Sequence, residues 1–317
     1  MKQESQQVYP GNHCQTWLSV LLLLSLGFSA FADESVPCLA YSQPSSIATI
    51  ADDRLTEISG LVSSRSQPGI LWMHNDSGDG AMVYAIDLTG QLLARVQLLD
   101  SDGAKMDAVD CEDIALGPGL GDGDFLFLAD IGDNAASRET IRIYRFPEPH
   151  FDAQETGSIL QTTAECDVIE AIYPDAPRDA ETLLVDPITG DIVVISKDFI
   201  RARAYRVPST ADDRFATLEF LFELPWGFIT GGDISPDGLS IILRGYWNAE
   251  IWKRSADGTD WWSMLAEPGC AVSVAAHDEP QGEAIGFSAD GTGYFSVSEG
   301  THPSLHFYRT TSNDSSD

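Results

Sequence analysis

One short pattern recurs five times along this chain: an acidic residue that opens an apolar stretch. Successive acids lie 50 to 69 residues apart. The copies are EISGLV at 57–62, EDIAL at 112–116, ETLLVD at 181–186, DISPDG at 233–238 and EAIGFS at 283–288. Self-similarity at such a period is typical of proteins built from repeated structural units. The chain is therefore expected to fold as an array of similar units.

Each unit contains short runs typical of β-strands. In the first unit, four runs rich in Val, Ile, Leu and aromatic residues are separated by breaks at Pro-Gly, Gly-Asp-Gly and Thr-Gly. Four strands in a repeat of this length are typical of a β-propeller blade. We therefore predict an all-β fold, a β-propeller of five four-stranded blades. Six blades remain the alternative, because the roughly 285 residues after residue 32 divide by six into an ordinary blade length.

The last unit is one strand short. Its three runs are EAIGFSADG, GYFSVSEG and LHFYRT, after which little chain remains. The segment 38–50, CLAYSQPSSIATI, precedes the first acid and belongs to no unit. We expect this N-terminal segment to supply the missing outer strand, because closing the ring removes two exposed sheet edges.

The first 32 residues have the pattern of a signal peptide. The apolar run at 17–32 ends in Ala-Phe-Ala, which fits the A-x-A cleavage pattern. An uncleaved anchor is the alternative, because little positive charge precedes this run. We expect residues 33–310 to form a single propeller domain and 311–317 a disordered tail. No other stretch is long and apolar enough to span a membrane, so we expect a soluble monomer that is periplasmic or secreted.

The composition is strongly acidic, with a formal net charge of −31. Only three lysines follow residue 32: Lys105, Lys197 and Lys253. Such a surface repels nucleic acid and anionic lipid, and it attracts cations. The favoured interpretation is a solvated surface suited to a salty medium, and no nucleic-acid partner is expected.

Four cysteines follow residue 32: Cys38, Cys111, Cys166 and Cys270. In an oxidising compartment an even number permits two disulfides, and three pairings are open. The cysteines are not spaced like the ligands of a zinc site. We expect Cys38 to pair with Cys270, because both fall on outer segments near the ends of the repeat array.

Propeller geometry predicts where the recurring acids lie in the fold. The first strand of a blade lies innermost, and its start shares one face with the turn between the second and third strands. Five acids should therefore surround one mouth of the central channel: Glu57, Glu112, Glu181, Asp233 and Glu283. The ends of the second strands should form the next ring outward, at 74–79, 130–134, 196–198, 244–246 and 298–300.

So many carboxylates in one place require positive charge, because like charges a few Å apart cannot all ionise without it. One source is calcium, which prefers Asp, Glu and Asn oxygens. The other source is internal, since Lys197 and Arg244 are expected at one second-ring position in the third and fourth units. Both explanations stay open. The candidate metal ligands are Glu57, Asn75, Asp76, Glu112, Asp113, Asp130, Asp133 and Asn134.

Familiar catalytic motifs such as HExxH, GxSxG and the Walker loop are absent. The candidates for chemistry are His74 or Glu112, which could activate water, and Lys197 and Arg244, which could hold an anionic substrate. Tyr246 follows Arg244 into a turn on the same face and could stack on a ligand. The candidate ligand-binding residues are Glu181, Asp233, Tyr246, Glu283 and Glu299.

The segments that carry these residues resemble a known family. They are EISGLVSS with ILWMHNDSGDG, EDIALGP with LFLADIGDN, AETLLVDP with VVISK, and QGEAIGFSADGTGYFSVSEG. Together they resemble the exported propellers grouped around the phytase-like domain ("esterase-like activity of phytase") and the related SdiA-regulated propellers. The resemblance implies a secreted or periplasmic propeller, calcium binding and a hydrolase function. The resemblance does not assign a catalytic role to any particular residue of this sequence.

A more distant similarity is to calcium-dependent propeller lactonases, which hold the metal with Glu, Asn and Asp. Glu57 and Asn75 match that pattern in kind, whereas the acids in all five units, Lys197 and Arg244 depart from it. Two functions are therefore expected. One is a calcium-dependent hydrolase of a small phosphoester, ester or lactone. The other is a non-catalytic ligand-binding or scaffold propeller with a salt-bridged, metal-free funnel that takes a small polar or anionic ligand.

Overall fold

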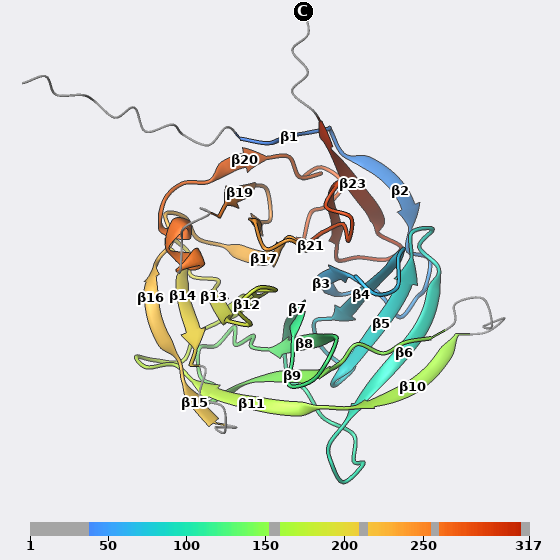
Figure 1. Ribbon diagram of the computed structural model, residues 1–317, viewed down its shortest axis with the longest axis vertical. Helices are drawn as coiled ribbons and strands as arrows, with labels where there is room; N and C mark the ends of the chain where they lie inside the picture. Colours follow the sequence, from blue (N-terminus) through green and yellow to red (C-terminus); the bar gives the residue numbers. More distant parts are fainter. Residues whose placement is uncertain (1–37, 152–158, 209–214, 255–259, 312–317) are drawn as a thin grey trace, which may run out of the picture. The chain divides into compact units, whose positions relative to one another are not determined.

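The computed structural model describes residues 38–151, 159–208, 215–254 and 260–311. They form five β-sheets arranged around one axis, as Figure 1 shows. The prediction of an all-β, five-bladed propeller is confirmed, and the six-blade alternative is wrong. The predicted signal peptide and tail lie outside the described residues, except that Thr311 ends the last strand.

Each of the first three blades has four antiparallel strands that follow the chain outward from the axis. Blade 1 consists of β3 (Ile58–Ser63), β4 (Ile70–Asn75), β5 (Met82–Asp87) and β6 (Leu92–Leu99). Blade 2 consists of β7 (Cys111–Pro118), β8 (Asp124–Asp130), β9 (Ile141–Pro147) and β11 (Asp167–Ile172). Blade 3 consists of β12 (Ala180–Val185), β13 (Ile192–Ser196), β14 (Arg203–Val207) and β16 (Glu219–Glu223).

The last two blades complete the ring. Blade 4 consists of β17 (Ile229–Ile234), β18 (Ser240–Gly245), β19 (Ala249–Lys253) and β20 (Cys270–Val272). A 3₁₀ helix, η1 (Trp261–Ala266), precedes β20. Blade 5 consists of β21 (Gly282–Phe287), β22 (Gly293–Ser298) and β23 (Ser304–Thr311), joined by β1 (Ala40–Tyr41) and β2 (Ser45–Thr49).

Closure of the ring follows the prediction. β1 and β2 both pair antiparallel with β23, so the N-terminal segment supplies the outer strand of blade 5. A disulfide joins Cys38 to Cys270, with a Cα–Cα distance of 5.7 Å, and so ties this segment to the outer strand of blade 4. The predicted pairing is confirmed. Cys111 and Cys166 are buried free thiols.

Two additional strands link neighbouring blades. β10 (Leu160–Glu165) precedes β11 in the chain but pairs parallel with β6 of blade 1. β15 (Phe215–Thr217) precedes β16 but pairs parallel with β11 of blade 2. Neither strand was predicted from the sequence, because each covers the outer edge of another blade and lies outside the repeat pattern.

Apolar side chains fill the spaces between the blades. Neighbouring residues of one strand point to opposite faces, so Leu128 packs with Trp72 toward blade 1 and Phe127 packs with Tyr205 toward blade 3. Strands buried on both faces need continuous apolar runs. This requirement accounts for segments such as FLFLA in β8.

The five inner strands, β3, β7, β12, β17 and β21, pack side by side in chain order, and β21 also packs against β3. Their backbones approach closely at the axis. A Cβ at Gly231 would lie 2.3 Å from the carbonyl oxygen of Glu283, and a Cβ at Gly286 would lie 2.6 Å from that of Leu61. Neighbouring inner strands therefore pack backbone against backbone at these two positions. No helix in the described part of the chain has the length and hydropathy that a bilayer crossing needs.

Candidate functional site

A β-bulge near the start of every inner strand determines the register of the site. A bulge places two residues opposite one on the partner strand. In the five inner strands the residue within the register shift is Ser59, Glu112, Glu181, Thr230 or Glu283. The end of the axis at which the inner strands start therefore carries three acids and two hydroxyl residues. We call it the acidic end.

The predicted ring of five acids is wrong at Asp233. Glu57 lies two residues before the bulge residue Ser59 and is exposed, and its charge adds to burial and to nearer acids in raising the pKa of Asp76 and of Glu299. Asp233 lies three residues after Thr230, and its carboxylate accepts the N–H of Phe287 at 2.7 Å. The physical reason is that the bulge sets the register, and the recurring acid does not keep a constant distance from it.

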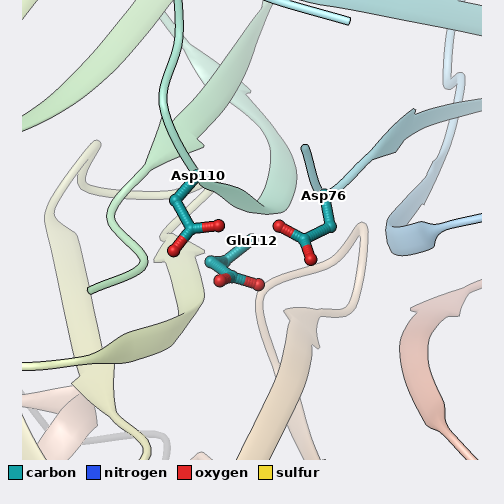
Figure 2. Close-up of side chains that lie close together, drawn as sticks. All are labelled: Asp76, Asp110 and Glu112. Carbon is teal, nitrogen blue, oxygen red and sulfur yellow. The ribbon is translucent and has the colours of Figure 1, made fainter. Parts of the chain in front are cut away.

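Five carboxylates gather at the acidic end where blades 1, 2 and 3 meet. This acidic cluster consists of Asp76, Asp110, Glu112, Asp179 and Glu181. Oxygens of Asp76, Asp110 and Glu112 lie within 4.8 Å of one another, and so do oxygens of Glu112, Asp179 and Glu181. Glu112 thus belongs to both triads. Figure 2 shows the carboxyl groups of Asp76 and Asp110 pointing toward one another beside Glu112.

Hydrogen bonds hold the first triad in place. The N–H of Cys111 donates to the carbonyl oxygen of Asp76 at 2.8 Å, which ties the end of β4 to the start of β7. The carboxylate of Asp130 accepts the N–H of Asp110 at 3.0 Å. The acids are thereby brought together by the backbone, against their mutual repulsion.

Burial and repulsion raise the pKa values of these acids. Burial, reinforced by Asp110, raises the pKa of Asp76 to about 8. Burial and then the charge of Glu181 raise the pKa of Glu112 far above its usual value. Burial also raises the pKa of Asp179. The ionised forms are therefore unfavourable unless a proton or a cation balances them.

One internal cation reaches the acidic cluster. The ammonium of Lys197 forms an ion pair with Glu181 and lies 5.1 Å from the centroid of the Tyr246 ring. Burial alone would lower the pKa of Lys197, but the charge and hydrogen bond of Glu181 together with Tyr246 outweigh burial and raise it. Within the described ranges, no lysine or arginine forms an ion pair with the first triad, Asp76, Asp110 and Glu112.

The donor set of the cluster fits a hard cation. Oδ1 of Asp76 and Oε2 of Glu181 are buried and have no hydrogen-bond partner among the described residues. A Cβ at position 132 would lie 2.2 Å from Oε1 of Glu112 and 2.6 Å from Oδ2 of Asp110, so glycine leaves these oxygens uncovered. Oxygen ligands from several carboxylates are what calcium prefers.

Arg244 does not share a ring position with Lys197, which corrects that expectation. β13 ends one residue before Lys197 and β18 ends one residue before Tyr246, so Tyr246 is the counterpart of Lys197. The side chain of Arg244 is fully buried between blades 4 and 5. It pairs with Glu279 at 3.0 Å and donates to the carbonyl oxygen of Ala284 at 3.2 Å. Arg244 therefore has a structural role, joining blade 4 to blade 5.

His74 also lies elsewhere than predicted. It belongs to β4, not to an exposed turn, and its side chain is fully buried. Burial lowers the pKa of His74 to about 4, so the ring is neutral at pH 7. Asn75 does not join the acidic cluster, because its amide donates to the carboxylate of Asp79 at 2.7 Å and its Oδ1 accepts the N–H of Glu57 at 3.2 Å.

Asp113 and Asp233 connect blades and do not belong to the acidic cluster. The carboxylate of Asp113 accepts the N–H of Leu183 in blade 3 at 2.8 Å. Asp233 makes the equivalent contact from blade 4 to Phe287 in blade 5. Burial raises the pKa of both carboxyls, although these N–H donors oppose the shift.

Asp130 and Asp133 lie outside the acidic cluster and hold two of its members in place by hydrogen bonds. Arg138 pairs with Asp130 at 2.8 Å, and the N–H of Arg138 donates to Asp133 at 2.6 Å. The N–H of Asp133 in turn donates to the carboxylate of Asp179 at 2.8 Å. Asn134 is exposed. Of the eight predicted metal ligands, the structure therefore brings only two into the cluster, Asp76 and Glu112.

The remaining predicted ligand-binding residues flank the acidic cluster on the side of blades 4 and 5. The hydroxyl of Tyr246 donates to Oε1 of Glu283 at 3.3 Å. The carboxylate of Glu299 accepts a hydrogen bond from Gln281 at 2.7 Å. Burial and then Glu283 raise the pKa of Glu299 to about 8. These acids extend the negative charge beyond the cluster.

The sequence analysis missed Asp110 and Asp179. A signal was present, because each precedes a bulge acid by two residues, as Asp-Cys-Glu at 110–112 and Asp-Ala-Glu at 179–181. Residues two apart in extended chain face the same side. The D-x-E spacing in two successive units therefore indicates paired carboxylates better than the isolated recurring acid does.

No protein-family model matches the chain, and no curated protein matches it. Among solved structures, the chain is similar to the β-propeller domain of Cps50 (Swd1) from Myceliophteria thermophila. The TM-score is 0.39 with 13% sequence identity, over 80% of this chain and 84% of that chain. The fold assignment rests on the strand topology, which defines five closed blades without this likeness. The resemblance to phytase-like propellers has no family match behind it.

Proposed function

We propose that the protein is a cation-binding propeller and that its acidic cluster binds one hard divalent cation of the calcium type. The ligands are Asp76, Asp110 and Glu112. The observation that carries the proposal is the uneven distribution of positive charge. Lys197 pairs with Glu181, whereas the first triad has no lysine or arginine ion pair within the described ranges.

This proposal takes up the calcium explanation of the carboxylates in preference to the metal-free funnel. The metal-free alternative needed Lys197 and Arg244 together, and Arg244 is committed to Glu279 between blades 4 and 5. Protons are the remaining competitors, because the raised pKa values favour neutral acids when no cation is bound. Cation binding should therefore release protons and strengthen as the pH rises.

The test is a calcium titration of protein treated with chelator, followed by melting temperature and by calorimetry. Calcium should raise the melting temperature with a stoichiometry of one, because a ligand that binds only the folded state stabilises it. Asp110→Asn should abolish this effect. The matched control is Asp122→Asn, an exposed turn residue between β7 and β8. A melting temperature that calcium leaves unchanged overturns the proposal.

The proposal places the protein outside the cytoplasm, in the periplasm or the medium. The apolar segment 17–32 favours export. The disulfide between Cys38 and Cys270 agrees with this, because such bonds persist in oxidising compartments. Fractionation of cells that produce the full chain, followed by mass measurement of the mature N-terminus, tests the assignment.

A hydrolase function is the second candidate, and the charge of the site favours a neutral ester or lactone over a phosphoester. One divalent cation and Lys197 supply three positive charges. They face seven carboxylates: Asp76, Asp110, Glu112, Asp179, Glu181, Glu283 and Glu299. An anionic phosphoester would meet net repulsion. The bound cation would polarise the carbonyl group of such a substrate.

The hydrolase candidate is tested on neutral esters, lactones and phosphomonoesters, each with calcium and with chelator. Turnover of a neutral substrate that chelator and Asp110→Asn abolish, and that Asp122→Asn leaves unchanged, supports it. A preference for phosphomonoesters contradicts the charge argument. Absence of turnover on every substrate excludes hydrolysis of these classes and leaves a non-catalytic cation-binding propeller.

A further inference from the structure

A group of large apolar side chains lies beside the acidic cluster, on blades 3 and 4. They occupy the β13–β14 loop, the segment just before β17 and the β18–β19 loop. Phe199 and Ile200 are each 74% exposed, and Trp247 is 68% exposed. We call this group the aromatic rim: Phe199, Ile200, Trp226, Phe228, Tyr246 and Trp247. Single exposed apolar residues are common on protein surfaces, whereas a contiguous group indicates a binding surface.

Direct contacts hold the rim together. The rings of Phe199 and Phe228 meet edge to face with their centroids 4.8 Å apart, and those of Tyr246 and Trp247 lie 5.7 Å apart. The backbones that carry the two pairs are adjacent, because a Cβ at Gly245 would lie 2.7 Å from the carbonyl oxygen of Phe228 and 3.4 Å from a ring carbon of Trp226. The loops of blades 3 and 4 that carry the rim thus lie side by side.

Phe228 has an unusual backbone conformation. Its φ angle of 56° is one that a bulky L-residue rarely adopts. The N–H of Phe228 donates to the carbonyl oxygen of Asp198 at 3.0 Å, and a Cβ at Gly227 would lie 2.2 Å from that same oxygen. Strain of this kind persists where the surrounding structure enforces it, often at ligand-binding sites. Here it packs the ring of Phe228 against the exposed ring of Phe199.

The rim and the acids meet at Tyr246. Its hydroxyl donates to Glu283, and its ring faces the ammonium of Lys197, which is paired with Glu181. The side chain of Glu181 is only 3% exposed, and its Oε2 has no partner in the described part of the chain. The protein's own ammonium group therefore lies between a carboxylate and an aromatic face. This combination is the one that recognises organic cations.

We propose that the aromatic rim and the adjoining acids form a docking surface for a basic segment of a partner polypeptide. An arginine or lysine side chain of the partner lies over the exposed rings of Trp247 and Phe199 and points its charge toward Glu283 and Glu299. Apolar side chains beside it cover Ile200. Charge complementarity decides the class of partner, because the net charge of −31 and the acids beside the rim repel acidic segments and attract basic ones.

A polypeptide fits this surface better than a small amine. The rim extends over the loops of two blades, so a single ammonium compound would leave most of its apolar area exposed. A segment that alternates basic and apolar side chains can satisfy the acids and cover the rim together. The proposal does not depend on a bound metal, although calcium in the acidic cluster would reduce the negative potential that attracts the partner.

The test uses two synthetic peptides and isothermal titration calorimetry. The probe is acetyl-Phe-Arg-Phe-Arg-amide, and its control carries citrulline, the neutral isostere, in place of arginine. The arginine peptide should bind, and the citrulline peptide should bind at least about tenfold more weakly. Trp247→Ala should weaken binding of the arginine peptide about tenfold. The matched control is Leu120→Ala, because Leu120 is 69% exposed but lies in the β7–β8 turn.

Every outcome of this test decides the proposal. Equal binding of the two peptides, no binding of either, or no effect of Trp247→Ala overturns it. Weaker binding with Leu120→Ala also overturns it, because the peptide then lies elsewhere. The outcome is distinct from that of the calcium titration. Protein that binds calcium but not the arginine peptide lacks only the docking surface, and protein that binds the peptide but not calcium lacks only the cation site.

Discussion

Lys197 and Glu181 form an ion pair at the acidic end of the propeller, and this pair divides the acidic cluster into two halves. On the blade 3 side, the ammonium offsets the charge of Glu181. On the side of blades 1 and 2, three carboxylates have no such partner among the described residues. Among the described residues, the acidic cluster thus has one lysine or arginine ion pair, and its remaining negative charge calls for an external cation.

Replacing Lys197 should open a second cation site. In Lys197→Gln, Glu181 loses its partner while its oxygens stay within 4.8 Å of those of Glu112 and Asp179. Calorimetric calcium titration should then give two bound ions in place of one. Without calcium at alkaline pH, loss of the pair should cost about 3 kcal/mol of unfolding free energy. The cost should be smaller at acidic pH, because Glu181 then takes up a proton. An unchanged stoichiometry of one would contradict the division of the cluster.

The stability of the calcium-free protein should fall as the pH rises. Burial raises the pKa of Asp76 and of Glu299 to about 8, from usual values of 3.8 and 4.5. Between these limits the folded state holds protons that the unfolded chain has lost, so the free energy of unfolding decreases with pH. Melting temperatures from about pH 5 to about pH 9 should show the decline. Calcium should reduce it, because the cation binds the ionised acids.

A matched pair of variants isolates this effect. Glu299→Gln removes one of the raised carboxyls and should flatten the pH profile of the calcium-free protein. Glu267→Gln changes an exposed residue next to η1 and should leave the profile as it is. Equal profiles for both variants would assign the decline to the general negative charge of the surface.

Arg244 should matter for stability and not for cation binding. Its guanidinium is fully buried and pairs with Glu279, which also accepts from Ser296 at 2.5 Å. Burial would raise the pKa of Glu279, but Arg244 together with His306 and Ser296 outweighs burial and lowers it. Arg244→Met leaves this carboxylate without its cation and should cost about 3 to 5 kcal/mol in urea unfolding. Adding Glu279→Gln should recover part of the loss. A reduced calcium affinity of the folded single variant would contradict the assignment.

The disulfide between Cys38 and Cys270 should stabilise the closed ring. Cys38→Ser releases β1 and β2 from the outer strand of blade 4 and should lower the free energy of unfolding by about 2 to 4 kcal/mol. A reducing agent should destabilise the original protein and leave this variant unaffected. Cys166→Ser serves as the control, because Cys166 is a free thiol whose loss should not alter the response to reductant. Thiol titration of the unfolded, unreduced protein that starts at residue 33, and so lacks Cys14, should detect Cys111 and Cys166.

Much of the fold was predictable from the sequence. Alternating apolar runs and turn residues define a strand by local rules, so the inner strands and most outer strands fall where the repeats place them. Even the missing outer strand follows from the repeat, since blade 5 lacks one run and residues 38–50 belong to no other blade. β10 and β15 were missed because each pairs with a blade that precedes it in the chain, and no local pattern encodes such a partner.

The candidate site was predictable only in part. Acids in the inner strands of blades 2, 3 and 5 reach the predicted end of the axis, and Asp76 joins them there. Asp233 misses the ring position because it lies three residues after Thr230, and an odd shift turns a strand residue to the other face. Glu57 lies two residues before Ser59, the same offset that Asp110 and Asp179 have from their bulge acids, but it is exposed. The bulges decide that register, and they depend on pairing between strands.

Five units, a strand pattern, a surplus of carboxylates and a segment able to close the ring can all be read from the amino-acid sequence. These properties follow from periodicity and composition, which are local. Which carboxylates meet, that Lys197 pairs with Glu181 while Arg244 is buried elsewhere, and that an aromatic rim lies beside them follow from the folded structure. Those relationships join residues of different blades, and they come into being only when the backbones pack around the axis.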